Sequence, residues 1–149
     1  MKTMMICACF ALSAATAFAT GKNKSHKALN NAAQTLSAVY ENVEHIVWSS
    51  ASNNMTKASF TLDGKPATAF FNPDGDLLAT SISVGYADLP KGVQKKWNRI
   101  AAETPVIEAF EMKSEEEHAY YLRTDNGGQD LVYRITPDGF ATVYTGKKK

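Results

Sequence analysis

A Pro-Asp-Gly motif that occurs twice constrains the fold of this chain more than any other feature. The motif stands at residues 73–75 and again at residues 137–139, an offset of 64 residues. At the same offset upstream apolar positions coincide, namely Leu29 with Val93, Ala33 with Trp97, Leu36 with Ile100, Val43 with Ile107, Ile46 with Phe110 and Trp48 with Met112. Chance could align one turn, but agreement over a helix, a strand and a turn indicates two tandem copies of one unit. The copies span residues 25–84 and 88–146.

Each copy is expected to begin with an amphipathic helix. In the first, Ser25 or Asn30 could cap the start, and apolar residues recur at steps of three and four: Leu29, Ala33, Leu36, Tyr40 and Val43. In the second, Asp88 is the cap candidate, Pro90 stands in the first turn and Pro105 ends the helix. Its apolar stripe is Val93, Trp97, Ile100 and Ala101, a spacing that favours core packing over ligand stacking for Trp97.

Short segments typical of strands follow each helix. They are "EHIVWSS", "KASFTL", "PATAFFN" and "LLATSISV" in the first copy, and "VIEAFEM", "HAYYLRT", "DLVYRIT" and "FATVYT" in the second. The links between them are rich in Asn, Asp and Gly, and the charged "KSEEEH" link is expected to be a solvated hairpin turn. Neighbouring strands this closely spaced must pair antiparallel, because a parallel return needs a dozen or more residues. The sequence therefore predicts an α+β fold, in which two helix-plus-meander repeats form one antiparallel sheet with both helices on one face.

Alternation along the strands assigns side chains to the two faces of this sheet. The residues expected to face the helices are Ile46, Trp48, Phe60, Leu62, Ala69, Phe71, Phe110, Met112, Tyr120, Leu122, Leu131, Tyr133 and Ile135. The opposite face would carry Val47, Thr68, Phe70, Glu111, Tyr121, Arg123, Val132 and Arg134. Aromatic, arginine and aliphatic side chains together are typical of a protein-binding surface. An ordinary solvent-facing sheet with a few exposed apolar side chains is the alternative.

The N-terminal segment predicts export. One lysine, an apolar run over residues 4–15 and a small-x-small ending at residues 17–19 are typical of a cleaved signal peptide over residues 1–19. A buried N-terminal helix and a lipid anchor at Cys9 are the alternatives. Both cysteines lie in this segment, so no disulfide is expected in the exported protein. We expect a flexible basic stretch over residues 20–27, one domain over residues 28–146, a basic tail over residues 147–149, and a periplasmic or secreted location.

The charge distribution bears on the partner. Once Lys2 and the six lysines of the two tails are set aside, 9 basic residues face 15 acidic ones. An acidic body argues against nucleic acid as the main partner. No run outside the N-terminal segment approaches the ~20 apolar residues of a membrane span, so we expect a protein that does not span the membrane. We also expect a monomer.

A search for catalytic and metal-binding patterns predicts neither a catalytic residue, nor a metal site, nor a cofactor. His26, His45 and His118 show no metal-ligand spacing, and a hydrolase would need His45 or His118 beside a nucleophile. The oxygens of Asn72, Asp74 and Asp76 suggest a calcium loop, but Gly75 precedes the third ligand and no glutamate follows at the required position. A hairpin turn explains the motif, because Gly can adopt the left-handed conformation that closes it.

The chain resembles the PepSY-like family of exported proteins of Bacteroidetes type, which is similar to the β-lactamase-inhibitor fold. The resemblance covers nearly all of the chain after the signal peptide. It depends on "HIVWSS" after the first helix, "DLPKGVQKKW" at the second, and the hairpins that begin at Phe71 and Ile135. It implies helices on one face of an antiparallel sheet and no catalytic residues. We therefore expect an exported, non-enzymatic binding protein, an inhibitor or regulator that engages a protein or peptide through the open sheet face. A small-molecule or lipid carrier is the alternative.

Overall fold

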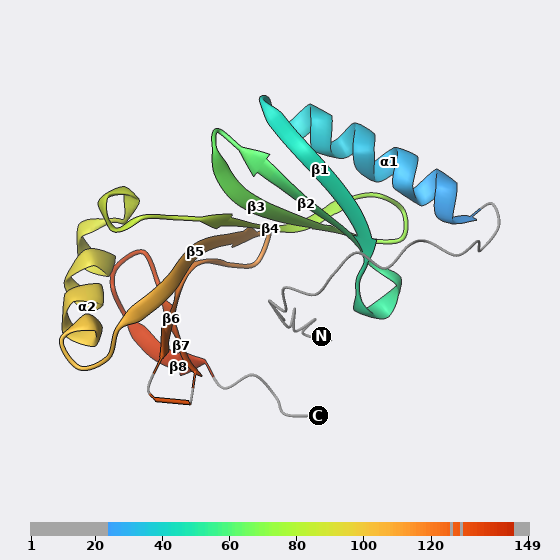
Figure 1. Ribbon diagram of the computed structural model, residues 1–149. Coiled ribbons are helices and arrows are strands. Elements are labelled where there is room, and N and C mark those ends of the chain that lie inside the picture. Colours follow the sequence, from blue (N-terminus) through green and yellow to red (C-terminus); the bar gives the residue numbers. More distant parts are fainter. Residues whose placement is uncertain (1–23, 126, 129, 145–149) are drawn as a thin grey trace.

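The computed structural model describes residues 24–125, 127–128 and 130–144, which form two helices and one sheet (Figure 1). The predicted signal peptide, the lipid-anchor alternative at Cys9 and the basic tail lie outside the described residues. The first half contains α1 (Lys24–Val39), β1 (Val43–Ser50), β2 (Thr56–Leu62), β3 (Lys65–Phe71) and β4 (Leu77–Ser83). The second contains α2 (Lys91–Ala101), β5 (Val106–Ser114), β6 (His118–Asp125), β7 (Asp130–Ile135) and β8 (Ala141–Tyr144). The short 3₁₀ helices η1 (Ser52–Asn54) and η2 (Tyr86–Asp88) precede β2 and α2.

All eight strands belong to one antiparallel sheet in sequence order, β1 to β8. This confirms the α+β class and the predicted helix-plus-meander architecture. Both helices lie on the same face, as one row of paired residues shows. Ala67 pairs with Ile82, Ile82 with Glu111, and Glu111 with Tyr120. Ala67 belongs to the core under α1 and Tyr120 to the core under α2, and residues directly opposite each other in a sheet share a face.

The core consists of two clusters, one beneath each helix. Under α1, Ala32 and Leu36 pack on Ala58, Phe60, Ala67, Ala69 and Phe71, with Trp48 partly buried beside them. Under α2, Val93 and Ile100 pack on Ala109, Tyr120, Leu122 and Ile135. Trp97 joins this second cluster and makes an edge contact with Tyr86, with ring centroids 5.7 Å apart, so its predicted core role is confirmed. No described helix is long and apolar enough to cross a membrane.

The helix starts differ from the expectation. Helix α1 begins at Lys24 and ends at Val39, its buried alanine is Ala32 rather than Ala33, and Val43 already belongs to β1. Asp88 does not cap α2, because its carboxylate accepts a hydrogen bond from the Gly85 N–H at 3.2 Å and so closes η2. Pro90 takes the N-cap position itself, so α2 begins two residues later than a cap at Asp88 implies.

The two Pro-Asp-Gly motifs form equivalent hairpin turns. In β3–β4 the Gly75 N–H donates to Asn72 O at 3.0 Å, and in β7–β8 the Gly139 N–H donates to Thr136 O at 2.8 Å. The two glycines have φ values of +95° and +94°, which confirms the predicted left-handed position. Each turn also packs against the helix of its own half. Gly75 abuts Asn31 and Ala32 of α1, and Gly139 abuts Gly92 of α2.

The sheet is bent between its halves, with the helices on its outer side (Figure 1). The uncovered face is therefore the inner side of the bend. Small residues occupy the uncovered face near the bend, and each of them is at most 9% exposed: Thr68, Ala79, Ser81 and Ala119. Small residues let the two halves of the sheet incline toward each other without side-chain clashes.

Two β-bulges change the predicted faces. In β1 the register shifts between Glu44 and Val47, with His45 at φ +53°, and Ile46 is 42% exposed instead of core-facing. In β5 the register shifts between Val106 and Glu108. Phe110 and Met112 therefore lie on the uncovered face, and Glu111 lies on the helix-covered one. The predicted faces of Phe110, Met112 and Glu111 were therefore wrong, because one extra residue in a strand exchanges its faces.

Candidate functional site

An aromatic cluster occupies the second half of the uncovered face. Phe110, Met112, Ala119 and Tyr121 are buried there, with Val132 and Tyr144 packed beside them. The rings of Phe110 and Tyr121 stack with centroids 5.1 Å apart and planes inclined by 4°. Tyr144 meets Tyr121 edge-on at 5.7 Å. Because these contacts restrict the rotamers of the rings, the cluster is a rigid apolar floor rather than a set of mobile side chains.

An ion pair lies against one side of this floor. Arg134 Nε donates to Glu117 Oε1, and the Tyr121 hydroxyl donates to the same oxygen at 3.1 Å. Burial, and next the nearby Glu117 carboxylate, raises the pKa of Tyr121 to about 12. The hydrogen bond from Arg134 to Glu117 raises the pKa of the guanidinium further above its ordinary value. Glu117 therefore couples the β5–β6 turn to β6 and β7, unlike the simple solvated turn that the sequence predicted.

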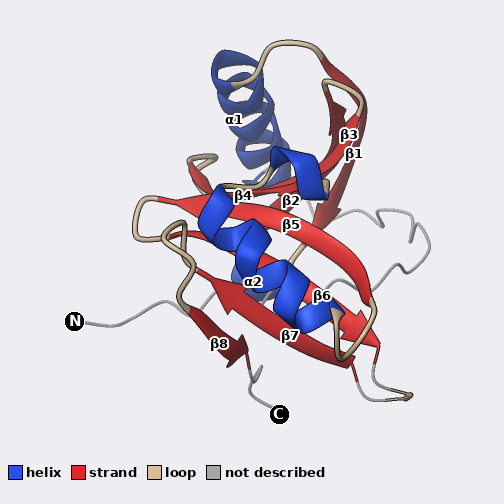
Figure 2. Ribbon diagram, turned by 90° about the vertical axis from the view of Figure 1, so that its left-hand side faces the viewer, coloured by secondary structure: helices blue, strands red, loops and turns tan. Residues whose placement is uncertain are grey.

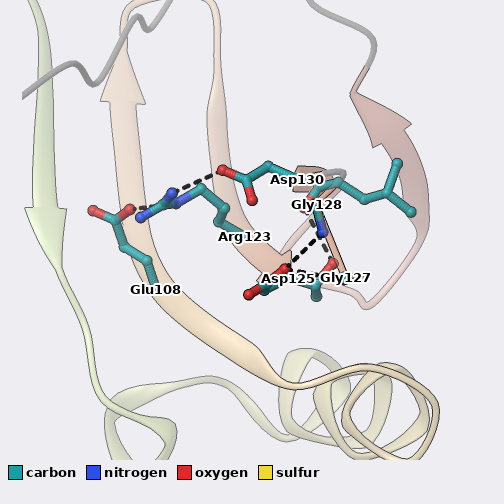
Figure 3. Close-up of polar contacts among 8 residues, drawn as sticks. Glu108, Arg123, Asp125, Gly127, Gly128 and Asp130 are labelled. Atoms are coloured by element: carbon teal, nitrogen blue, oxygen red, sulfur yellow. Dashed lines mark hydrogen bonds and ion pairs between the residues drawn. The ribbon is translucent and has the colours of Figure 1, made fainter.

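A second arginine bridges two carboxylates near the other end of the face (Figure 3). Arg123 Nε donates to Glu108 Oε2 at 2.9 Å, and its Nη1 donates to Asp130 Oδ2 at 3.0 Å. These residues come from β6, β5 and β7, so the guanidinium links three adjacent strands. Burial opposes the charge of Arg123, but hydrogen bonds to Asp130 and Glu108 outweigh it and raise its pKa. The side chain remains 39% exposed, so a partner could still reach it.

The first half of the face has a different character. Val47 is 59% exposed, and Phe70 on β3 is half-buried. Around them the pairing places hydroxyl side chains on the same face, namely Ser59, Thr68 and Ser81. The uncovered face thus combines a small polar half on β1 to β4 with an aromatic and ionic half on β5 to β8. We call the whole surface the inner face.

Most of the residues predicted for the inner face lie on it. The strand pairing places Val47, Thr68, Phe70, Tyr121, Arg123, Val132 and Arg134 there. Glu111 is the exception. Its Oε1 accepts hydrogen bonds from the Tyr120 hydroxyl at 3.0 Å and pairs with His118 Nε2 at 2.7 Å and Lys113 Nζ at 3.1 Å. Burial raises the pKa of Glu111, but these three partners outweigh it and lower the pKa overall.

The structure is similar to several solved structures of Bacteroides proteins. A BLIP-like protein from Bacteroides fragilis NCTC 9343 superposes with a TM-score of 0.67 at 16% identity, over 79% of this chain and 84% of the other. A DUF2874 family protein from Bacteroides ovatus ATCC 8483 gives 0.66 at 16% identity, over 76% and 85%. The chain has the BLIP-like fold. The predicted β-lactamase-inhibitor-like architecture is therefore confirmed.

The BLIP-like fold is the extent of what these similarities show. A third structure, a candidate periplasmic protein from Bacteroides eggerthii DSM 20697, gives a TM-score of 0.65 at 18% identity over 76% of this chain and 87% of the other. Its description agrees with the export predicted from the sequence. Comparison with protein-family models and with curated proteins finds no match, so the PepSY-like name stays a prediction.

The histidines of this BLIP-like chain give no support to a hydrolase. The His45 side chain is 82% exposed, and the His118 ring bonds to the Glu111 carboxylate and not to a nucleophile. Among the described residues, no three His, Cys, Asp or Glu side chains lie together as a metal site would require.

Phe110, Met112, Glu117 and Tyr144 are among the inner-face residues that sequence reasoning missed. The apolar positions in β5 did signal that Phe110 and Met112 would be buried, but not on which face. The opposite charges of Glu117 and Arg134 could have suggested their pairing only with the register of β6 and β7 known. Tyr144 was assigned to a strand but to neither face.

Proposed function

We propose that this BLIP-like chain is an exported, non-enzymatic binding protein that engages a protein or peptide through its inner face, as an inhibitor or regulator. The observation that carries the proposal is the ordered aromatic floor of Phe110, Tyr121 and Tyr144 bordered by Arg123 and Arg134. Aromatic and arginine side chains dominate the binding energy of protein interfaces, and a rigid surface loses less entropy on association.

The exposed groups on this face offer a partner two kinds of contact, apolar area and hydrogen-bond donors. Val47, at 59% exposure, offers apolar contact area at the edge of the sheet. Arg134 is 32% exposed and Arg123 39% exposed, so both offer donors to a partner. Because both arginines are already held by carboxylates, a partner would meet them in fixed positions. Such preorganised charges favour specificity more than raw affinity.

Capture from a periplasmic extract tests the proposal. Purified protein immobilised on resin would be compared with Val47→Asp and Arg134→Ala, and the captured proteins identified by mass spectrometry. We expect a specific partner whose recovery falls by about tenfold or more in both variants, because truncating a hot-spot residue costs more than 1 kcal/mol.

Matched controls lie on the outer side of the molecule. Val39→Asp introduces the same charge at an exposed aliphatic residue of α1, and Arg99→Ala removes an exposed arginine of α2. These two should leave capture unchanged. Equal recovery by all four variants would refute the inner face as the binding surface, and location would be checked separately by cell fractionation.

A further inference from the structure

The outer side of α2 carries a group of cations that make no ion pair with the residues the structure describes. Lys91, Lys95 and Arg99 follow one another at four-residue steps, so they share a face of the helix, and Lys96 lies at its flank. Val93 and Ile100 occupy the opposite, buried face. Figure 2 looks onto this outer side, where α2 crosses the sheet. We call Lys91, Lys95, Lys96 and Arg99 the basic helix face.

Exposed aromatic side chains flank the basic helix face. Tyr86, 40% exposed, contacts Trp97, and its hydroxyl accepts a hydrogen bond from Asn98 Nδ2 at 2.9 Å. Phe140 is 65% exposed and follows Gly139, whose backbone touches Gly92 of α2. Tyr86 is therefore held beside α2 by its own contacts, and Phe140 lies near the helix because its neighbour Gly139 packs on Gly92.

Acidic residues near α2 offset only part of its charge. Asp88 is paired with Lys65 at 3.0 Å, so this pair adds no net charge. Asp138, in the same hairpin as Phe140, and Glu103, after the helix, are exposed. Four cations against these two carboxylates leave the outer side positive, whereas the Arg123 and Arg134 side chains of the inner face are neutralised by carboxylates.

We infer that the outer side of α2 docks reversibly onto an anionic lipid surface. Unpaired lysine and arginine side chains are attracted to anionic headgroups, and aromatic side chains suit the boundary between headgroups and acyl chains. Because the apolar side of α2 is buried in the core, the helix binds without inserting, and contact is limited to cations and flanking rings. Exposed rings beside unpaired cations fit the headgroup boundary of a lipid surface, and an acidic protein is the alternative that the test below separates. The inner face, on the opposite side of the sheet, stays free while the protein is docked.

Vesicle co-sedimentation tests this inference. Purified protein would be mixed with vesicles of phosphatidylcholine containing 30% phosphatidylglycerol, and with vesicles of phosphatidylcholine alone, at low and at physiological ionic strength. We expect binding to the anionic vesicles that weakens with salt. Lys95→Gln combined with Arg99→Gln should reduce the partition coefficient by about 30-fold, since each cation near the surface contributes about fivefold.

Control variants separate this surface from net charge. Lys27→Gln combined with Lys57→Gln removes the same charge elsewhere and should change partition little. Phe140→Ser should weaken partition, whereas Val39→Ser, a comparable exposed site on α1, should not. Circular dichroism would verify that all variants fold.

Three results would overturn the inference. The first is no binding to anionic vesicles at low salt, and the second is an equal loss in both double variants. The third is binding to soluble polyglutamate as tight as to vesicles, with Phe140→Ser neutral, which would assign the surface to an acidic protein instead.

Discussion

Replacing Gly75 by alanine should destabilise the protein far more than the same change at Gly64. Both glycines have positive φ, +95° and +77°, so alanine is strained at either site. They differ in their surroundings. A Cβ at Gly64 would meet nothing within 4 Å, whereas a Cβ at Gly75 would lie 2.4 Å from Asn31 Cβ and 2.7 Å from the Ala32 backbone nitrogen. The pair of variants therefore separates backbone strain from the contact between the hairpin and α1.

The magnitude follows from these two contributions. A left-handed conformation costs an alanine about 1–2 kcal/mol, and the loss of chain entropy in the unfolded state returns about 0.4–1 kcal/mol. Gly64→Ala should thus lower the free energy of unfolding by about 1 kcal/mol. At Gly75 the overlap with helix backbone adds about 1–3 kcal/mol, for a total near 3 kcal/mol. Any shift of the hairpin also strains the hydrogen bond from Thr35 Oγ1 to Gly75 O, now 2.9 Å.

Urea unfolding followed by circular dichroism and tryptophan fluorescence would measure both variants. We expect a much lower midpoint for Gly75→Ala, with an unchanged slope. Equal losses at the two positions would refute the claim that the Pro-Asp-Gly turn is part of the helix-packing interface. Gly139→Ala, which would place a Cβ 2.8 Å from Gly92 O, should repeat the large effect in the second half.

Three further predictions concern the sheet. Phe110→Ala should lower the free energy of unfolding by about 3–5 kcal/mol in urea titrations, because a buried ring is removed; a loss below 1 kcal/mol would contradict its place in the aromatic floor. Tyr120 and Tyr121 have pKa values raised to about 12, so their neutral forms stabilise the fold. This contribution is complete below pH 10 and is lost as pH rises toward 12, and absorbance at 295 nm together with urea unfolding at alkaline pH would follow the loss. Titration of both tyrosines near pH 10 would refute the prediction. Because the pKa of Glu111 is lowered, its stabilising contribution is present above about pH 4.5 and is lost as pH falls further. Glu111→Gln should therefore lose less stability than the wild type between pH 6 and pH 3. Parallel losses in the two proteins would contradict this.

Much of the fold was predictable because it depends on local chemistry. Both helices, all eight strands and both Pro-Asp-Gly turns occur where the residue patterns placed them, within a few residues. The turns were the most reliable signal, since φ is +95° at Gly75 and +94° at Gly139, values that glycine adopts without strain. Helix boundaries were predicted less reliably. Asp88 bonds to the Gly85 N–H and not to α2, a choice between two nearby partners that the sequence does not decide.

Face assignment was not predictable in β5, and in β1 it failed at Ile46, although Val47 and Trp48 lie on the faces predicted for them. The 64-residue offset aligned Met112 with Trp48, yet Trp48 packs under α1 and Met112 lies on the inner face. Alternation has a period of two, so a single bulge residue reverses it, and bulges leave no dependable mark in these two strands. The error wrongly placed Glu111 in the predicted site and concealed Phe110.

The sequence by itself determined the elements of this protein, their order, and the duplicated unit, because propensity, periodicity and turn chemistry act over a few neighbouring residues. Tertiary structure decided which side chains meet. Arg134 reaches Glu117 and Arg123 reaches Glu108 only through strand register, and the cations of α2 gather beside Phe140 only because Gly139 packs on Gly92. Contacts between residues far apart in the chain depend on register, bulges and the bend of the sheet, and these are set by the packing of the whole domain.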